Sequence, residues 1–254
     1  MVRACQPELL DSLAPDDPGA VGSRRDLRRL NFWMGNARLI ANALKSFLPE
    51  QPEQKILEIG AGDGTLLLEI ARRLSPKSSR WSAMLLDRQE IITSATRTQF
   101  QALGWGAKTV KADVFEYFQS GSSSSAGSYD AIIANLFLHH FSAEALAELF
   151  RLAQTRTRLF IAIEPRRSRL SLLAGRLIWA IGCNSVTRHD AVVSIRAGFC
   201  GQEFSSLWPQ TAGWTREEHP AGLFSHVFIA RWEHQALLAS EEATSRAEAM
   251  DFSI

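Results

Sequence analysis

Three glycines occupy every second position between an apolar run and a helix-like run in KILEIGAGDGTLLLEI, residues 55–70. Because they lack a Cβ, Gly60, Gly62 and Gly64 let the backbone turn tightly and approach a ligand closely. Glu58 lies two residues before the first of them, so the pattern is E-x-G-x-G-x-G. A bare turn between a strand and a helix, next to an acid, indicates a site for a nucleotide-like ligand.

Two more acids follow apolar runs. Asp87 ends WSAMLLD, and a carboxylate there can accept hydrogen bonds from both hydroxyls of a ribose. Asp113 ends the next run, where an acid can reach an adenine amino group and Val114 can supply an apolar wall. The dinucleotide fingerprint G-x-G-x-x-G is not met, because the third glycine comes one residue early and position 65 is Thr.

Strand-like and helix-like segments alternate from residue 55 onward and position these groups. Apolar runs predict strands over 55–60, 81–87, 108–114, 129–138 and 158–165, and helical periodicity predicts helices over 65–74, 90–103 and 142–154. This alternation favours a parallel sheet covered by helices on both faces. The carboxyl ends of parallel strands share one edge, where open α/β folds bind ligands.

The flanking segments complete the expected organisation. Residues 1–22 are interpreted as a flexible segment and 23–50 as a helical cap, with Ser23 as N-cap and Pro49 after its end. The main domain is expected over 51–237, with a lid-like insertion at 166–205 and a tail at 238–254. The insertion includes a helix over 187–199, and two strands turned at 220–222 form a late hairpin.

The composition is that of an ordinary globular protein, since 46% of the 254 residues are hydrophobic and 22% are charged. A net charge of +1 gives no sign of a nucleic-acid partner, which would show as a basic excess. The three cysteines, Cys5, Cys183 and Cys200, lie far apart and are interpreted as buried thiols. The chain start lacks a signal-peptide pattern, which favours a cytoplasmic enzyme.

The segments LEIGAGDG, LLD, ADV and YDAIIANLFLHHF, in this order and spacing, resemble the motifs of class I S-adenosylmethionine-dependent methyltransferases. The resemblance covers residues 55–165. It implies a Rossmann-like, seven-stranded, mostly parallel α/β sheet whose last strand is antiparallel, and S-adenosyl-L-methionine as cofactor. The NLFLHHF form resembles methyltransferases that act on small aromatic, quinone-like or polyketide-like acceptors.

The same resemblance assigns the cofactor-binding residues. These are Glu58, Gly60, Gly62, Gly64, Asp87, Arg88, Asp113, Val114, Asn135 and Leu136. The acid and glycines of the loop would hold the amino-acid end, Asp87 the ribose, and Asp113 with Val114 the adenine. Asn135 and Leu136 would flank the methyl group. The alternative is purely structural: glycines that make a tight turn and an aspartate that caps a helix.

An acceptor hydroxyl must lose its proton during methyl transfer, and histidine is suited to take it. His139 and His140 follow the fourth expected strand and are the first catalytic candidates, unless they only hydrogen-bond the next loop. His189, in the helix over 187–199, is a third candidate, with a capping or surface role as its alternative. No trio of His, Cys and carboxylate has metal-ligand spacing along the chain, so the sequence predicts no metal.

Aromatic and soft side chains in the cap and the insertion suit a lid over a flat apolar acceptor, with core packing as the alternative. They are Trp33, Met34, Trp179, Phe199 and Trp208. The basic and apolar stretch over 166–182 also allows contact with a membrane surface. The sequence favours O-methylation of a small acceptor. The alternatives are C- or N-methylation, an NAD(P)-dependent oxidoreductase, and a non-catalytic cofactor-binding subunit.

Overall fold

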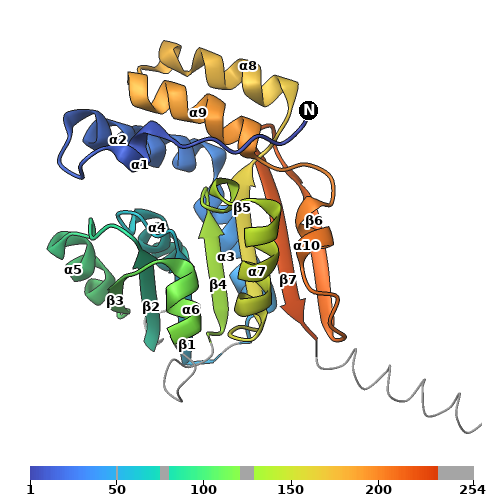
Figure 1. The fold of residues 1–254 in the computed structure, drawn as a ribbon. Coiled ribbons are helices and arrows are strands. Elements are labelled where there is room, and N and C mark those ends of the chain that lie inside the picture. The colour runs from blue at the N-terminus through green and yellow to red at the C-terminus, as the bar shows by residue number, and fades with distance from the viewer. Residues whose placement is uncertain (50, 75–79, 121–128, 234–254) are drawn as a thin grey trace, which may run out of the picture.

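A seven-stranded sheet organises the chain in the computed structural model, which describes residues 1–49, 51–74, 80–120 and 129–233. The strand order is β3-β2-β1-β4-β5-β7-β6, with β1 to β5 parallel and β7 antiparallel to β5 and β6 (Figure 1). The strands are β1 Glu53–Ile59, β2 Arg80–Asp87, β3 Gly106–Lys111, β4 Ala131–Asn135, β5 Leu159–Pro165, β6 Trp214–Ala221 and β7 Ser225–Trp232. The expected Rossmann-like sheet with an antiparallel last strand is confirmed.

Helices cover both faces of this sheet and its carboxyl edge (Figure 1). They are α1 Leu9–Ser12, α2 Pro18–Met34, α3 Asn36–Phe47, α4 Thr65–Leu74, α5 Ser94–Ala102, α6 Val114–Ser120, α7 Ala143–Gln154, α8 Arg169–Leu177, α9 Ser185–Ala197, α10 Glu203–Leu207, and the short 3-10 helices η1 Leu138–His140 and η2 Ile178–Ile181. Within the described ranges, no helix has the combined length and hydropathy that crossing a bilayer requires.

Alternate residues of each central strand enter two separate cores, since successive strand side chains point to opposite faces. Ile56 of β1 and Ile133 of β4 pack with α3 and α4 on one face, whereas Leu57 and Ile132 pack with α6 and α7 on the other. Every residue of β4 and β5 is therefore buried. Burial on both faces explains why these strands are continuous apolar runs in the sequence.

The cap begins earlier than expected and is broken in the middle. Asp17 is the N-cap of α2 and accepts hydrogen bonds from the N–H groups of Gly19 and Ala20, with Pro18 as the first helical residue. This start is stronger than one at Ser23, because proline at the first position has the helical φ already fixed. The expected N-cap at Ser23 is wrong. Gly35, at φ 72°, ends α2 and separates it from α3.

Residues 1–22, expected as a flexible segment, contain α1 and the start of α2 and contact distant parts of the chain. The Asp190 carboxylate of α9 accepts hydrogen bonds from the N–H groups of Leu9 and Leu10, at 2.8 and 3.0 Å. Arg3 donates to the carbonyl oxygens of Ala197 and Phe141. These partners lie more than 130 residues away, so local periodicity could not indicate them.

The helices α1, α2, α8 and α9 pack together beyond the carboxyl ends of β4 and β5 (Figure 1). These four helices cover the edge of the sheet where the sequence predicts the ligand site. Helix α9 starts at Ser185, after its N-cap Asn184 and two residues before the expected start. Among the cysteines Cys183 is buried, whereas Cys5 is exposed, which corrects the interpretation of Cys5 as a buried thiol. The expected tail at 238–254 lies outside the described residues.

Candidate active site

The glycine loop connects β1 to α4 and has a left-handed backbone at all three glycines. The φ angles are 68° at Gly60, 54° at Gly62 and 73° at Gly64, a region that favours glycine. A Cβ added to Gly60 would lie 2.3 Å from the Phe137 ring, whereas one added to Gly62 would meet no atom within 4 Å. Gly60 is therefore required by packing, and Gly62 keeps the backbone open.

Two acids flank this loop in different ways. Asp87 at the end of β2 accepts hydrogen bonds from Gly62 N and Gln89 N, both at 2.8 Å, so its carboxylate fixes the loop. Glu58 is 2% exposed, and its Oε2 has no hydrogen-bond partner among the described residues. Burial, together with the charges of Asp63 and Asp87, raises the pKa of Glu58 well above its ordinary value. A cationic ligand would relieve this cost.

A cavity of about 500 Å³ lies over the loop and collects most of the predicted cofactor residues. Those that line it are Glu58, Gly60, Gly62, Asp87, Arg88, Asn135 and Leu136. Gly64, Asp113 and Val114 do not line it. Asp113 accepts a hydrogen bond from Phe115 N at the start of α6, and Val114 is buried in the core, because β3 ends before them.

Helix α2 supplies lining residues that the sequence reasoning missed. Arg24, Leu27, Arg28 and Asn31 lie on the cavity, and Arg28 forms an ion pair with Asp63 of the glycine loop at 2.6 Å. These residues recur at three- and four-residue steps on one helix face. This helical spacing is the sequence signal that could have grouped these four residues on one face of α2. It does not indicate that the polar residues of that face line a cavity.

Asparagines fix the end of β4. Asn36 donates to Asn135 Oδ1 at 2.8 Å and to Asn31 Oδ1 at 2.9 Å, and Asn135 Nδ2 donates to Asn31 Oδ1 at 3.2 Å. The next residue, Leu136, has a left-handed φ of 50°, which is costly for a side chain with a Cβ. The network holds the turn that carries Leu136 into the cavity.

A second cavity of about 420 Å³ adjoins the first, and both are lined by Leu27 and Leu136. Its walls are largely apolar and come from α2, α8, η2 and α9; they include Leu30, Trp33, Met34, Ile178 and Ile195. Trp33 and Met34 therefore lie where a lid was expected.

Three other aromatics of that expectation lie elsewhere. Trp179 is 58% exposed, and Phe199 and Trp208 are buried in the core on the α7 face of the sheet. The structure thus contradicts a lid role for Phe199 and Trp208. Their side chains enter the core because the insertion returns to the sheet at Phe199, which pairs with Arg166 as an isolated bridge.

Two charged side chains, Glu8 and His139, line the second cavity, and Glu164 lies behind them. His139 Nδ1 lies 2.7 Å from Glu164 Oε2, and His139 Nε2 lies 3.1 Å from Glu8 Oε1. Burial alone would lower the pKa of His139, but hydrogen bonds and charges of the two carboxylates raise it to about 10. Burial alone would raise the pKa of Glu8, but the hydrogen bond and the charge of His139 outweigh it, so that the Glu8 pKa is lowered. The ring is a cation between two anions.

The other two histidine candidates differ in position. The ring of His140 stacks near that of His139, at 4.3 Å between centroids, and His140 Nδ1 lies 3.4 Å from Asp11 Oδ2. Burial, and then the charge of His139, lower the pKa of His140. His189 lies away from the linings of both cavities, with half of its side chain exposed and its ring bonded to Asp190.

Known proteins match this fold and this motif region. Residues 56–158 match a family model described as a methyltransferase domain. A carboxy-S-adenosyl-L-methionine synthase from Nautilia profundicola is 28% identical over 102 residues, which cover 40% of this chain and 41% of that protein. The match falls short of half of either chain.

Solved structures share the fold at low sequence identity. A candidate O-methyltransferase from Nostoc punctiforme is 17% identical with a TM-score of 0.51, covering 91% of this chain and 64% of that one. An N,N-8-amino-8-demethyl-D-riboflavin dimethyltransferase from Streptomyces davawensis is 14% identical with a TM-score of 0.55, covering 89% of this chain and 62% of that one. The chain thus spans less than two thirds of the length of these relatives.

The sheet order, the glycine loop and the acids at the strand ends define the class I S-adenosylmethionine-dependent fold. Residues 56–158 match the methyltransferase-domain model, and this match, together with the fold, supports S-adenosyl-L-methionine as the cofactor. Open glycine backbone and an unpartnered buried carboxylate oxygen in the first cavity fit that cationic ligand.

Gly60→Ala tests the tight packing of the loop. The substitution should lower the free energy of unfolding by roughly 2–5 kcal/mol, from the left-handed φ and from overlap with Phe137. Gly222→Ala is the matched control, because it has a similar φ of 67° with no atom within 4 Å of the added Cβ. It should cost about 1–2 kcal/mol in urea unfolding. Equal losses in both variants would argue against the overlap.

Asp87→Ala should weaken binding of S-adenosylhomocysteine by about 1.5–3 kcal/mol, which is roughly 10- to 150-fold, measured by calorimetry. The control is Asp130→Ala, because the Asp130 carboxylate also accepts from a backbone N–H, that of Lys55, but at the opposite edge of the sheet. Unchanged affinity in the Asp87 variant would remove this residue from the site.

Alkaline pH should destabilise the protein through His139. Its folded-state pKa of about 10 lies above the ordinary value of 6.5, so the stabilisation is complete below about pH 6.5 and is lost as pH rises through 10. Urea unfolding between pH 7 and 10 should show a slope of at most about 1.4 kcal/mol per pH unit from this group. His139→Gln should flatten the slope, and an unchanged slope would contradict the assignment.

Proposed function

We propose that this chain transfers the methyl group of S-adenosylmethionine to a hydroxyl oxygen of a small apolar or aromatic acceptor. One observation carries the proposal: the cofactor cavity and an apolar cavity adjoin at Leu27 and Leu136, and the charged side chains of Glu8 and His139 line the apolar one. Such an arrangement suits two ligands held end to end, which is what an in-line transfer requires.

S-adenosylmethionine supplies an electrophilic methyl group on a sulfonium. The protein's task is therefore to hold the cofactor, orient the acceptor and exclude water. Glu58 would face the cationic amino-acid end, Arg28 would pair with its carboxylate on leaving Asp63, and Asp87 keeps the loop in the binding conformation. Asn135 and Leu136 stand at the junction, where the methyl group would lie.

The walls of the second cavity receive the acceptor's apolar body, and Glu8 receives its hydroxyl. The His139 ring carries both of its protons at neutral pH and directs them at Glu164 and Glu8, so His139 orients Glu8 and cannot take the acceptor's proton. Glu8, ionised and on the cavity, is the group able to accept that proton. His140 supports His139, and His189 has no part in this arrangement.

The relatives leave the methylated atom open, since one solved structure is a candidate O-methyltransferase and another a dimethyltransferase whose name specifies methylation at nitrogen. Glu8 on the wall of the cavity favours oxygen, because an acceptor hydroxyl must lose its proton during transfer and this carboxylate can take it. A neutral amine acceptor would gain less from it. N- or C-methylation of a similar molecule is the competing proposal.

The test is incubation with methyl-labelled cofactor and a panel of phenols, amines and carbon acids, followed by mass spectrometry. The expected result is a mass gain on a hydroxyl oxygen. Ala174→Phe should fill the second cavity and reduce transfer at least tenfold without changing affinity for S-adenosylhomocysteine. Ala180→Phe, at an exposed position of η2, is the control and should retain activity. Labelling at nitrogen or carbon would favour the competitor.

A different outcome would remove the enzyme class altogether. Tight binding of S-adenosylhomocysteine with no labelled product from a broad panel or from cell extract would favour a non-catalytic cofactor-binding subunit. NADH, by contrast, should leave the melting temperature unchanged, and a rise with NADH but not with S-adenosylhomocysteine would favour an oxidoreductase.

A further inference from the structure

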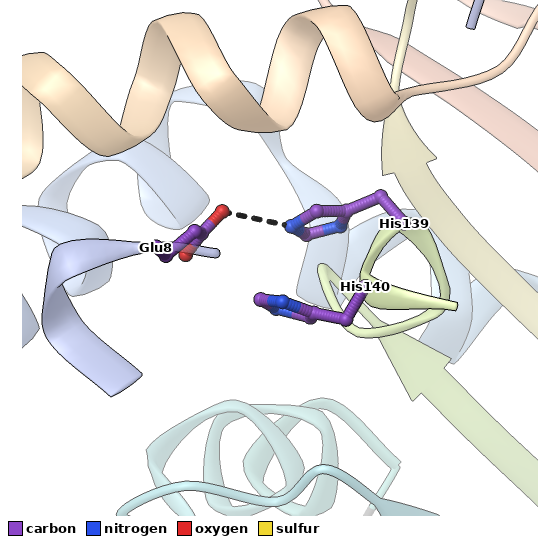
Figure 2. A group of neighbouring side chains, drawn as sticks. All are labelled: Glu8, His139 and His140. Atoms are coloured by element: carbon purple, nitrogen blue, oxygen red, sulfur yellow. Dashed lines mark hydrogen bonds and ion pairs between the residues drawn. The ribbon is translucent and has the colours of Figure 1, made fainter. Parts of the chain in front are cut away.

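Three metal-ligating side chains meet beside the apolar cavity, which two of them, Glu8 and His139, line. One carboxylate oxygen of Glu8 and one ring nitrogen each of His139 and His140 lie within 4.8 Å of one another. Figure 2 shows the three side chains directed toward a common space, with Glu8 coming from the N-terminal segment and the histidines from η1. We propose that Glu8, His139 and His140 bind a divalent zinc-type cation whose open coordination position faces the acceptor cavity.

One pair of ligand atoms already has the separation that this cation requires. Zinc binds imidazole nitrogen at about 2.0–2.1 Å and carboxylate oxygen at about 2.0–2.2 Å, so two ligands of a tetrahedron lie roughly 3.3 Å apart. His139 Nε2 and Glu8 Oε1 are 3.1 Å apart. A cation can therefore take the place of the proton that these two groups share. Metal binding would convert His139 to neutral imidazole, the form that ligates.

A carboxylate lies behind each ring, and the one behind His139 is hydrogen-bonded to it. Glu164 is 2.7 Å from His139 Nδ1, and Asp11 is 3.4 Å from His140 Nδ1. A carboxylate on the far nitrogen of a ligating histidine is the usual outer partner in zinc sites, where it fixes the ring and raises its basicity. Glu164 is itself fixed, since it also accepts from the backbone N–H groups of η1.

The charge and the donor types favour zinc over a hard cation. Glu8, Glu164 and Asp11 place three carboxylates around two imidazoles, and a divalent cation balances more of that charge than one shared proton does. Two nitrogen donors and one carboxylate are a zinc-type set, whereas Mg²⁺ prefers oxygen donors alone. The sequence predicts no metal because these ligands have no spacing pattern, Glu8 lying 131 residues before His139.

The location connects the cation to the acceptor. Glu8 and His139 line the apolar cavity, and Asp11 lines the cofactor cavity. Three protein ligands leave a fourth position, as in catalytic zinc sites. An acceptor hydroxyl bound there would release its proton to solvent, and its oxygen would form the new bond to the methyl carbon as the carbon–sulfur bond breaks. This last step rests on the proposed function, whereas metal binding does not.

The test uses the full chain freed of metal by chelation, then titrated with Zn²⁺ by calorimetry and with Co²⁺ by visible absorption. The expected result is one Zn²⁺ per chain and the absorption of a four-coordinate Co²⁺ site. His140→Ala and Glu8→Gln should each weaken Zn²⁺ binding at least tenfold. His219→Ala is the control, since its ring is exposed and contacts only the neighbouring Pro220 carbonyl among described hydrogen bonds. Circular dichroism and S-adenosylhomocysteine affinity verify that each variant is folded.

The outcomes separate the two proposals. No Zn²⁺ binding by the native chain, or equal binding by all variants, overturns the metal site whatever the activity. Zn²⁺ binding that is lost in the ligand variants supports the site, even if no acceptor is ever methylated and the proposed function fails. Methyl transfer at the same rate with and without bound Zn²⁺ overturns the contact between metal and acceptor.

Discussion

One buried carboxylate fixes the geometry on which both cavities depend. Glu164, at the end of β5, is fully buried, and burial of a charge without partners costs several kcal/mol. Its oxygens accept from the N–H groups of Phe137, Leu138 and His139 and pair with the His139 ring. These donors all belong to the turn after β4. A single acid on one strand thus sets the backbone path that leaves the neighbouring strand.

That path explains the unusual features around it. Phe137 fills the space beside Gly60, so the glycine loop must lack a side chain there. Leu136 accepts a left-handed φ, a cost of the order of 1 kcal/mol that the asparagine network and the turn offset. Contacts between residues far apart in the sequence thus meet at the turn after β4, where cofactor and acceptor would adjoin. Local strain is concentrated where the chemistry is proposed, and the remainder of the sheet is regular.

The sequence specified the sheet well because its signals are local. Continuous apolar runs marked β1, β4 and β5, and glycines with Glu58 marked the loop. The N-terminal helices were harder to predict from the sequence. The start of α2 after Asp17 was missed, and the contacts of Glu8 and Arg3 join segments far apart in the chain. Asp113 and Val114 were expected to end the third strand, but β3 ends at Lys111. Pairings that no short window contains must come from the structure.

Leu136 lines the cofactor cavity and the acceptor cavity at once, and so does Leu27 from the cap. Each ligand therefore meets side chains that the other also touches. The first ligand to bind would select a conformation of these two leucines, and the second ligand would then contact them in that conformation. Thermodynamic linkage makes such coupling mutual: the factor by which cofactor alters acceptor affinity equals the factor by which acceptor alters cofactor affinity. Ligands bound in the two cavities as proposed would therefore be coupled through these shared walls.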